Sequence, residues 1–281
     1  MVYGGVSVSD LFHQRPPDKG DPIEPASGIR LKMSTSLTSF TNGLNAVVIG
    51  ASGAIGSAFV DSLIGDPRVA HVGACSRSQF GTTNAKQTHH VVDLDEESTI
   101  IAAARENARL GPVDLVIVAT GILHNGDRVQ PEKTWRSIDA EAMAEVFRIN
   151  TIGPALVAKH FLPHLARDRK SVFAALTARV GSIADNRLGG WHAYRASKSA
   201  LNMLIKNFAI EIERRNKCAI CVGLHPGTVA TPLSAPFRSS GAKNKLFSPQ
   251  HAVQCMLAVV DTLRPKDSGK TFAWDGSDIP F

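Results

Sequence analysis

From residue 45 onward, short apolar runs alternate with longer segments whose apolar residues recur every three or four positions. Short runs of this kind predict buried strands, and the longer spacing predicts helices that pack by one face. The predicted strands are 46–49, 69–75, 89–92, 113–119, 171–176, 219–224 and 271–274. The predicted helices are 55–64, 98–110, 140–166, 191–215 and 249–263.

This alternation of strands and helices is typical of βαβ units, whose crossovers are right-handed. It predicts an α/β protein with a Rossmann-type, doubly wound parallel sheet of about seven strands and helices on both faces. We expect the sheet and its helices to form a single domain over residues 44–281.

Residues 1–43 lack a sustained apolar period and hold several prolines among Gly, Ser and charged residues. This composition predicts a loose or peripheral N-terminal extension ahead of the domain. Met33, just before the first strand, offers an alternative start of the chain. Acidic residues in the extension argue against a transit peptide. Organellar targeting therefore stays open only as an alternative to the cytoplasmic location that we expect.

The chain has 281 residues, of which 43% are hydrophobic and 20% charged, and this excludes a disordered tail and a disulfide mini-scaffold. The net charge of +6 is spread without a dense basic run, so it suits an anionic ligand and predicts no nucleic-acid partner. No apolar stretch approaches the roughly 20 residues that span a bilayer, and we expect no membrane partner.

Cys218 and Cys221 form a C-x-x-C, which raises the question of a metal or redox site. The pair lies in a strand-like run, without a second ligand pair at zinc spacing and not at a helix start. We therefore expect structural cysteines, no metal site and a reducing compartment.

A glycine-rich turn, GASGAIG, joins the first strand to the first helix. Gly50, Gly53 and Gly56 let backbone N–H groups approach a pyrophosphate at the helix N-terminus, where the helix dipole favours negative charge. Glycines alone are weak evidence. Their position between a strand and a helix predicts a dinucleotide site rather than a tight turn without a ligand.

The second strand ends in Cys75-Ser76-Arg77-Ser78 and carries no acidic residue there. An acid at this place would bind the ribose 2′-hydroxyl of NAD, whereas an arginine suits the 2′-phosphate of NADP. Arg77 therefore predicts NADP(H) in preference to NAD(H). The alternative is that Arg77 is a solvated loop charge.

Tyr194 and Lys198 lie four residues apart, on one face of the helix predicted at 191–215. A phenol titrates near 10 in water, so a tyrosine that exchanges protons near neutral pH needs a nearby cation such as Lys198. Alone, the spacing is that of an ordinary helix surface. Together with the dinucleotide signals, it indicates an acid/base pair.

Four motifs together resemble the short-chain dehydrogenases/reductases, from Asn45 to the C-terminus. They are GASGAIG, FRINTIGPALVAKHFLP around Asn150, YRASKSALN and HPGTVATPL. The segments ARVGSIADNRLGGWHAYRASKSALN and WDGSDIPF are similar to the carbonyl-reductase-like branch that includes the sniffer and C-factor proteins. The combination is specific, although each motif alone is not.

The resemblance implies that Tyr194 is the general acid/base, that Lys198 lowers the Tyr194 pKa and holds the nicotinamide ribose, and that Asn150 supports a water-linked proton relay. The family also uses a serine that hydrogen-bonds the reacting carbonyl, about twelve residues before the tyrosine. Ser182 stands at this distance and is the expected residue. Thr177 is the alternative, because Thr177-Ala178 stands where relatives often have two serines.

The resemblance also implies the cofactor contacts. Ala54 stands where many members have glycine, and Ala119-Thr120-Gly121 replaces the familiar Asn-Ala-Gly. The expected cofactor-binding residues are Gly50, Ser52, Ala54, Ile55, Gly56, Ser76, Arg77, Asp93, Leu94, Ala119, Thr120, Gly121, Asn150, Tyr194, Lys198, Pro226, Gly227, Thr228, Val229 and Thr231.

Two loops hold candidate substrate contacts. The polar segment 234–247 stands where the family has a mobile lid, so Phe237 and Leu246 are candidates to close over a substrate. His124, Asn125 and Trp191 flank the expected site and are candidates to shape the pocket. An ordinary surface loop and solvated side chains are the alternatives.

We therefore expect an NADP(H)-dependent oxidoreductase that interconverts a small-molecule carbonyl and alcohol by hydride transfer, without a metal. The alternative is an NADP-binding sensor or signalling protein of C-factor type with incidental turnover, which a complete proton-donating set argues against. An epimerase would need a larger substrate domain than the chain after His225 allows. The resemblance implies a homodimer or homotetramer formed through the helices at 140–166 and 191–215.

Overall fold

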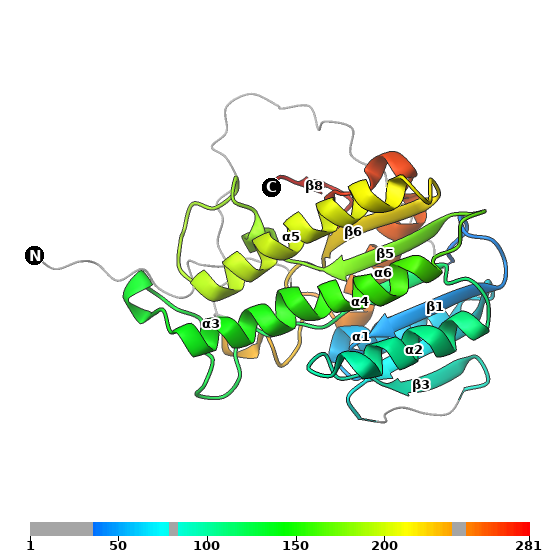
Figure 1. Ribbon diagram of the computed structural model, residues 1–281. Coiled ribbons are helices and arrows are strands. Elements are labelled where there is room, and N and C mark those ends of the chain that lie inside the picture. Colours follow the sequence, from blue (N-terminus) through cyan, green and yellow to red (C-terminus); the bar gives the residue numbers. More distant parts are fainter. Residues whose placement is uncertain (1–35, 79–83, 238–245) are drawn as a thin grey trace, which may run out of the picture.

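The computed structural model describes residues 36–78, 84–237 and 246–281. One eight-stranded sheet forms its centre, in the order β3-β2-β1-β4-β5-β6-β7-β8 (Figure 1). The strands are β1 (Leu44–Ile49), β2 (Val69–Ser76), β3 (Gln87–Val91), β4 (Leu115–Val118), β5 (Ser171–Leu176), β6 (Ala219–His225), β7 (Thr271–Ala273) and β8 (Asp278–Ile279). Neighbouring strands are parallel except β7 and β8.

Helices cover both faces of this sheet (Figure 1). One face packs against α1 and α6, and the other against α2, α4 and α5. The helices are α1 (Ala54–Gly65), α2 (Glu97–Arg109), α3 (Ala140–Phe147), α4 (Gly153–Phe161), α5 (His192–Glu213) and α6 (Pro249–Thr262). Strands β1, β4 and β5 are buried at every residue, which explains their near-continuous apolar sequences.

The predicted doubly wound Rossmann fold is confirmed. The chain winds from β1 to β3 toward one edge, then returns to β4 and winds toward the other edge. Ligands of such sheets bind beyond the carboxyl ends of the strands where the order reverses, here between β1 and β4. The predicted count of about seven strands omitted β8, because a two-residue strand is too short to show a pattern.

The prediction of a single helix over 140–166 is wrong, because the structure divides this segment into several helical elements. After α3 comes a π-helical turn, η3 (Arg148–Ile152), then α4 and a 3₁₀ turn, η4 (Leu162–His164). The Gly153 N–H donates to the Arg148 carbonyl, five residues back, and Pro154 has no N–H to continue an ordinary ladder. Apolar spacing does not distinguish a π turn from an α turn.

Residues 36–43, which belong to the predicted loose or peripheral extension, pack against the domain. Leu37 and Phe40 are buried on the α1 and α6 face. The Leu37 N–H donates to Asp66 at 2.8 Å, and the Ser39 N–H donates to Asp261 at 2.7 Å. Isolated apolar residues in a polar stretch give no periodic signal. The rest of the predicted extension, with Met33, lies outside the described residues.

Within the described ranges, no helix is long and apolar enough to cross a membrane, and no group of three or more His, Cys, Asp or Glu side chains is placed to hold a metal ion. The four cysteines are free thiols. Cys221 is buried in β6, and Cys218 lies just before that strand.

Candidate active site

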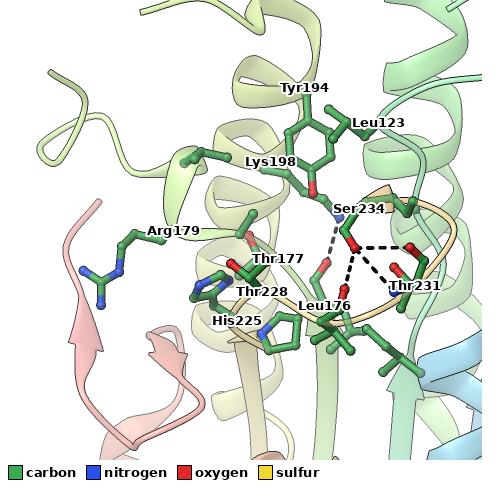
Figure 2. A pocket seen from close by; sticks show the side chains of 18 of the residues that line it. Leu123, Leu176, Thr177, Arg179, Tyr194, Lys198, His225, Thr228, Thr231 and Ser234 are labelled. Atoms are coloured by element: carbon green, nitrogen blue, oxygen red, sulfur yellow. Dashed lines mark hydrogen bonds between the residues drawn. The ribbon is translucent and has the colours of Figure 1, made fainter. Parts of the chain in front are cut away.

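A cavity of about 460 Å³ opens at the carboxyl ends of β4, β5 and β6, beside the start of α5. Its walls combine apolar and polar groups (Figure 2). The lining residues are Ile55, Ala119, Thr120, Gly121, Leu123, Leu176, Thr177, Ala178, Arg179, Val180, Trp191, Tyr194, Lys198, His225, Pro226, Gly227, Thr228, Val229, Thr231, Leu233, Ser234, Phe247 and Trp274.

Tyr194 and Lys198 both reach this cavity from α5. The Lys198 Nζ lies 6.0 Å from the centre of the Tyr194 ring, and Figure 2 shows the phenol oxygen directed toward the ammonium group. Lys198 is buried, and its Nζ donates to the Leu176 carbonyl at 2.8 Å. The predicted four-residue spacing therefore does bring the two side chains together.

Burial sets the protonation of both groups. It raises the pKa of the Tyr194 phenol to about 12 and lowers the pKa of the Lys198 ammonium to about 8. Tyr194 is thus a neutral phenol at pH 7 and a ready proton donor. The resemblance implies that Lys198 lowers the pKa of Tyr194. In this structure, removal of water from the buried phenol raises that pKa instead.

The start of α5 is held by the loop between β4 and α3. Trp191 precedes the helix in the left-handed region, with φ 50°, which is unusual for a residue other than glycine. Its N–H donates to the Glu132 carbonyl at 2.6 Å, and the Ala193 N–H donates to the Glu132 carboxylate at 3.1 Å. The indole also meets the Tyr194 ring edge-on at 6.2 Å. This arrangement orients Tyr194.

Asn150 lies in the π-helical turn η3 and is fully buried. Its Oδ1 accepts from the Ile122 N–H at 2.8 Å, and its Nδ2 donates to the Ile122 carbonyl at 2.9 Å. A Cβ on Gly121 would come within 3.4 Å of both Asn150 Oδ1 and Lys198 Nζ. Asn150 therefore holds the loop after β4 beside Lys198, although it does not line the cavity itself.

The two candidate hydroxyls differ in their surroundings. Thr177 lines the cavity at the end of β5, and its hydroxyl donates to Asn202 Oδ1 at 2.7 Å. Ser182 is buried, is not among the lining residues, and accepts from the Asp185 N–H at 3.1 Å. The geometry therefore favours Thr177 over the expected Ser182.

The glycine-rich turn is as tight as the sequence suggested. Gly50 has φ +84°, and a Cβ on Gly56 would lie 2.1 Å from the Gly50 carbonyl oxygen. The first turn of α1 has no capping side-chain hydrogen bond and no acidic residue, so its N–H groups suit an anion. Ser52 and Ala54 are exposed on this turn, and Ile55 continues it into the cavity.

Two further loops shape the cofactor side of the cavity. Thr120 Oγ1 is buried with no hydrogen-bond partner among the described residues, so a bound ligand could satisfy it. On the loop after β6, the Ser234 hydroxyl donates to the Val229 carbonyl at 2.5 Å, and the Thr231 N–H donates to Ser234 Oγ at 3.3 Å. The predicted residues that line the cavity here are Ala119, Thr120, Gly121, Pro226, Gly227, Thr228, Val229 and Thr231.

The residues predicted for the adenosine end lie apart from the cavity lining. Arg77 is exposed just past β2. The Ser76 hydroxyl donates to the Ser78 carbonyl at 2.6 Å and so stabilises the turn that carries Arg77. Asp93 Oδ1 accepts from the Asp95 N–H at 3.0 Å, and Leu94 packs close to Gly153.

The predicted substrate contacts are only partly at the cavity. Trp191 lines it, whereas His124 contacts the Pro232 carbonyl and Asn125 donates to Glu145. Phe247, which was not among the predicted contacts, also lines it. Leu246 is 47% exposed, and residues 238–245 of the expected lid lie outside the described residues. Sequence reasoning missed Leu123, Val180, Leu233 and Trp274, because apolar residues in loops and turns carry no chemical signature.

Strand order and the glycine turn without a capping side chain place the protein in the Rossmann class of dinucleotide-binding folds. Within that class, residues 44–241 match the family model for short chain dehydrogenases. The chain belongs to the short-chain dehydrogenase family and is an oxidoreductase of that type.

Relatives support the carbonyl-reductase-like branch. C-signal of Myxococcus xanthus is 34% identical over 178 residues, which covers 62% of this chain and 96% of C-signal. The NADPH-bound carbonyl reductase from chicken fatty liver has a TM-score of 0.72 and 26% identity, and covers 86% of this chain and 100% of its own. Carbonyl reductase Sniffer of D. melanogaster has a TM-score of 0.74 and 20% identity, with 85% and 100% covered.

Proposed function

We propose that the protein is an NADP(H)-dependent reductase that interconverts a carbonyl and an alcohol, with Tyr194 as the general acid/base. The observation that carries the proposal is the placement of Tyr194 and Lys198 in one cavity with the loops after β4 and β6. NADPH bound there would supply a hydride to the carbonyl carbon. The protein must then supply a proton to the carbonyl oxygen.

Tyr194 is suited to give that proton. Because burial raises its pKa to about 12, the phenol is protonated across the physiological range. Lys198, which lies beside the ring, stabilises the phenolate left after transfer, and Asn150 holds the adjoining loop in place. In the direction of alcohol oxidation, the same phenol must first lose its proton, so higher pH favours oxidation.

Thr177 is the hydroxyl that we place at the carbonyl oxygen, because it lines the cavity and Ser182 does not. A hydroxyl donor at this position stabilises the charge that develops on the oxygen during hydride transfer. The cavity wall formed by Leu123, Trp191 and Phe247 suits an apolar or aromatic carbonyl compound.

The first experiment is titration of the purified protein with NADPH and NADH, followed by the loss of reduced-cofactor absorbance with aldehydes, ketones, quinones and the aromatic diketone benzil. We expect tighter binding of NADPH and turnover of at least one carbonyl. Tyr194→Phe should lower kcat by about 10²–10⁴-fold and leave the NADPH dissociation constant within about twofold. Wild-type turnover in Tyr194→Phe would remove the assigned acid.

A second candidate function is an NADP-binding sensor or signalling protein with incidental turnover, which the similarity to C-signal favours. The same experiment separates the two candidates. Tight NADPH binding without turnover of any carbonyl in the panel would support the sensor and contradict the reductase.

A further inference from the structure

A buried polar cluster adjoins Thr177 at the end of β5. It joins Thr177, which follows β5, to Asn202 in α5 and Thr271 in β7, whose exposed fractions are 4%, 2% and 1%. Asn202 lies one helical turn beyond Lys198. A polar cluster this deeply buried must satisfy its hydrogen bonds within itself or with a ligand.

Strand β6 leaves room for the cluster by carrying a glycine. Gly223 pairs with Thr271 in β7. A Cβ on Gly223 would lie 2.7 Å from Thr271 Oγ1 and 3.0 Å from Thr177 Cγ2. The two threonines therefore meet over Gly223, and the Asn202 amide contacts both hydroxyls.

The amide group of Asn202 determines what Thr177 can do. Asn202 Oδ1 accepts from the Thr177 hydroxyl at 2.7 Å and from the Thr271 hydroxyl at 3.4 Å. Asn202 Nδ2 is buried and has no hydrogen-bond partner among the described residues. In this arrangement Thr177 gives its only hydrogen to Asn202, so it cannot donate to a carbonyl oxygen.

A half-turn of the amide about its terminal torsion exchanges Oδ1 and Nδ2 and leaves the rest of the side chain in place. Nδ2 then donates to both threonine oxygens. The Asn202 amide oxygen is then the unpaired atom, in place of the Asn202 NH₂ group. Proteins tolerate a buried unpaired oxygen more readily than an unpaired N–H. The Thr177 hydrogen becomes available to an oxygen atom in the cavity.

We propose that Asn202 is a positioning residue for carbonyl reduction: its amide, turned so that Nδ2 donates to Thr177, makes the Thr177 hydroxyl the donor to the substrate oxygen. The inference rests on the proposed reductase function with Thr177 at the carbonyl. Asn202 acts only through Thr177, and its effect grows as negative charge develops on the substrate oxygen.

The test is a double-mutant cycle in steady-state turnover of benzil with NADPH. Thr177→Val should lower kcat by about 10²-fold, and Asn202→Leu by about tenfold, with the NADPH KM within about twofold in both. Because Asn202 acts through Thr177, Asn202→Leu should cause no further loss in the Thr177→Val background. Thr177→Ser should keep most of the activity, because it keeps the hydroxyl.

Asn202→Ala covers the case in which Asn202→Leu does not fold. It removes the amide without adding volume, so turnover should fall by about tenfold, as in Asn202→Leu. Asn207→Leu is the matched control, because it makes the same change at an exposed position of α5 and should keep the wild-type kcat.

The outcomes distinguish the role of Asn202 from the role of Thr177 and from the proposed reductase activity. Wild-type kcat in Asn202→Leu or Asn202→Ala, together with a loss in Thr177→Val, would overturn the role of Asn202 and leave that of Thr177 standing. Additive losses in the double variant would also overturn it. Full turnover in Thr177→Val would remove Thr177 from the carbonyl, and no benzil or panel turnover in the wild type would overturn the proposed reductase.

Discussion

Ser182 and Thr177 show how strongly the surroundings of a hydroxyl decide its chemistry. Ser182 accepts the Asp185 N–H and caps a turn outside the cavity lining. We expect Ser182→Ala to lower the free energy of unfolding by about 1 kcal/mol, because it leaves that N–H without its partner. The kcat should stay within about threefold of wild type.

Denaturant unfolding and carbonyl turnover of the same Ser182→Ala preparation measure the two effects. A loss of kcat by about 10²-fold with unchanged stability would return the carbonyl role to Ser182.

Arg77 is the residue on which the preference for NADPH depends. It is exposed just after β2, and the Ser76 hydroxyl fixes the turn beneath it. Arg77→Ala should weaken NADPH binding by about tenfold or more, because a charge-assisted contact with the 2′-phosphate is lost. NADH lacks that phosphate and should bind almost unchanged. Fluorescence titration with both nucleotides measures the ratio, and equal weakening would contradict the assignment.

At single residues, the sequence predicted chemistry that depends on local spacing better than chemistry that depends on folding. Tyr194 and Lys198 share a helix, so their spacing in the sequence was enough to predict that their side chains lie close together. The choice between Ser182 and Thr177 depended on the path of the chain after β5, which residue spacing does not determine. Asn202 gave no signal, because an asparagine in a helix becomes informative only once its neighbours in β7 are known.

Among the elements, the turn from β1 into α1 leaves no room for a side chain on Gly56. Gly56→Ala would place a methyl group 2.1 Å from the Gly50 carbonyl oxygen and force the two segments apart. We expect a loss of about 2 kcal/mol or more in the free energy of unfolding, and weaker NADPH binding because the N–H groups of the turn move. Gly65→Ala is the control, since nothing lies within 4 Å of its Cβ.

Thermal unfolding with and without NADPH distinguishes the two glycine variants. A Gly56→Ala protein as stable as Gly65→Ala would show that the turn can open without loss.

The order of elements was predictable because each buried parallel strand has its own apolar run. The interruption of the helix predicted at 140–166 was not, because apolar spacing is the same in a π turn and an α turn. The hydrogen bonds of Asn150 in η3 go to Ile122, which the sequence does not place beside it. Likewise, Leu37 and Phe40 became part of the core only through contacts with the α1 and α6 face. Contacts between segments far apart in the sequence decide such details.

For the whole molecule, buried bases predict how stability depends on pH. Burial lowers the pKa of His225 to about 4, and the pKa values of His71 and His90 are lowered as well. Between about pH 4 and 6.5 the unfolded chain therefore binds more protons than the folded one, and stability falls as the solution is acidified. Lys170 and Lys198, each with a pKa lowered to about 8, make stability rise with pH from about 8 to 10.5.

Denaturant unfolding at pH 7 and pH 5 tests the acidic part of this prediction. His225→Gln should lose about 2 kcal/mol less than the wild type between these two pH values, because it removes one titrating group. An identical loss in both proteins would show that His225 is not buried as a neutral base.

The dimer or tetramer that we expect stays a prediction. Met203 and Ile210 are exposed on α5, one of the helices through which the subunits would associate.

The cap that Glu132 places on α5 also has a consequence for the order of folding. Glu132 and Ala193 are 61 residues apart, so the first turn of the helix cannot acquire its cap until that long stretch of chain has closed. The pairing of Ala46 in β1 with Leu115 in β4 closes a stretch of similar length. The N–H groups at the start of α5 should therefore become protected from hydrogen exchange together with the sheet, and not earlier as in a locally capped helix. Tyr194 would reach its working position only as the sheet forms.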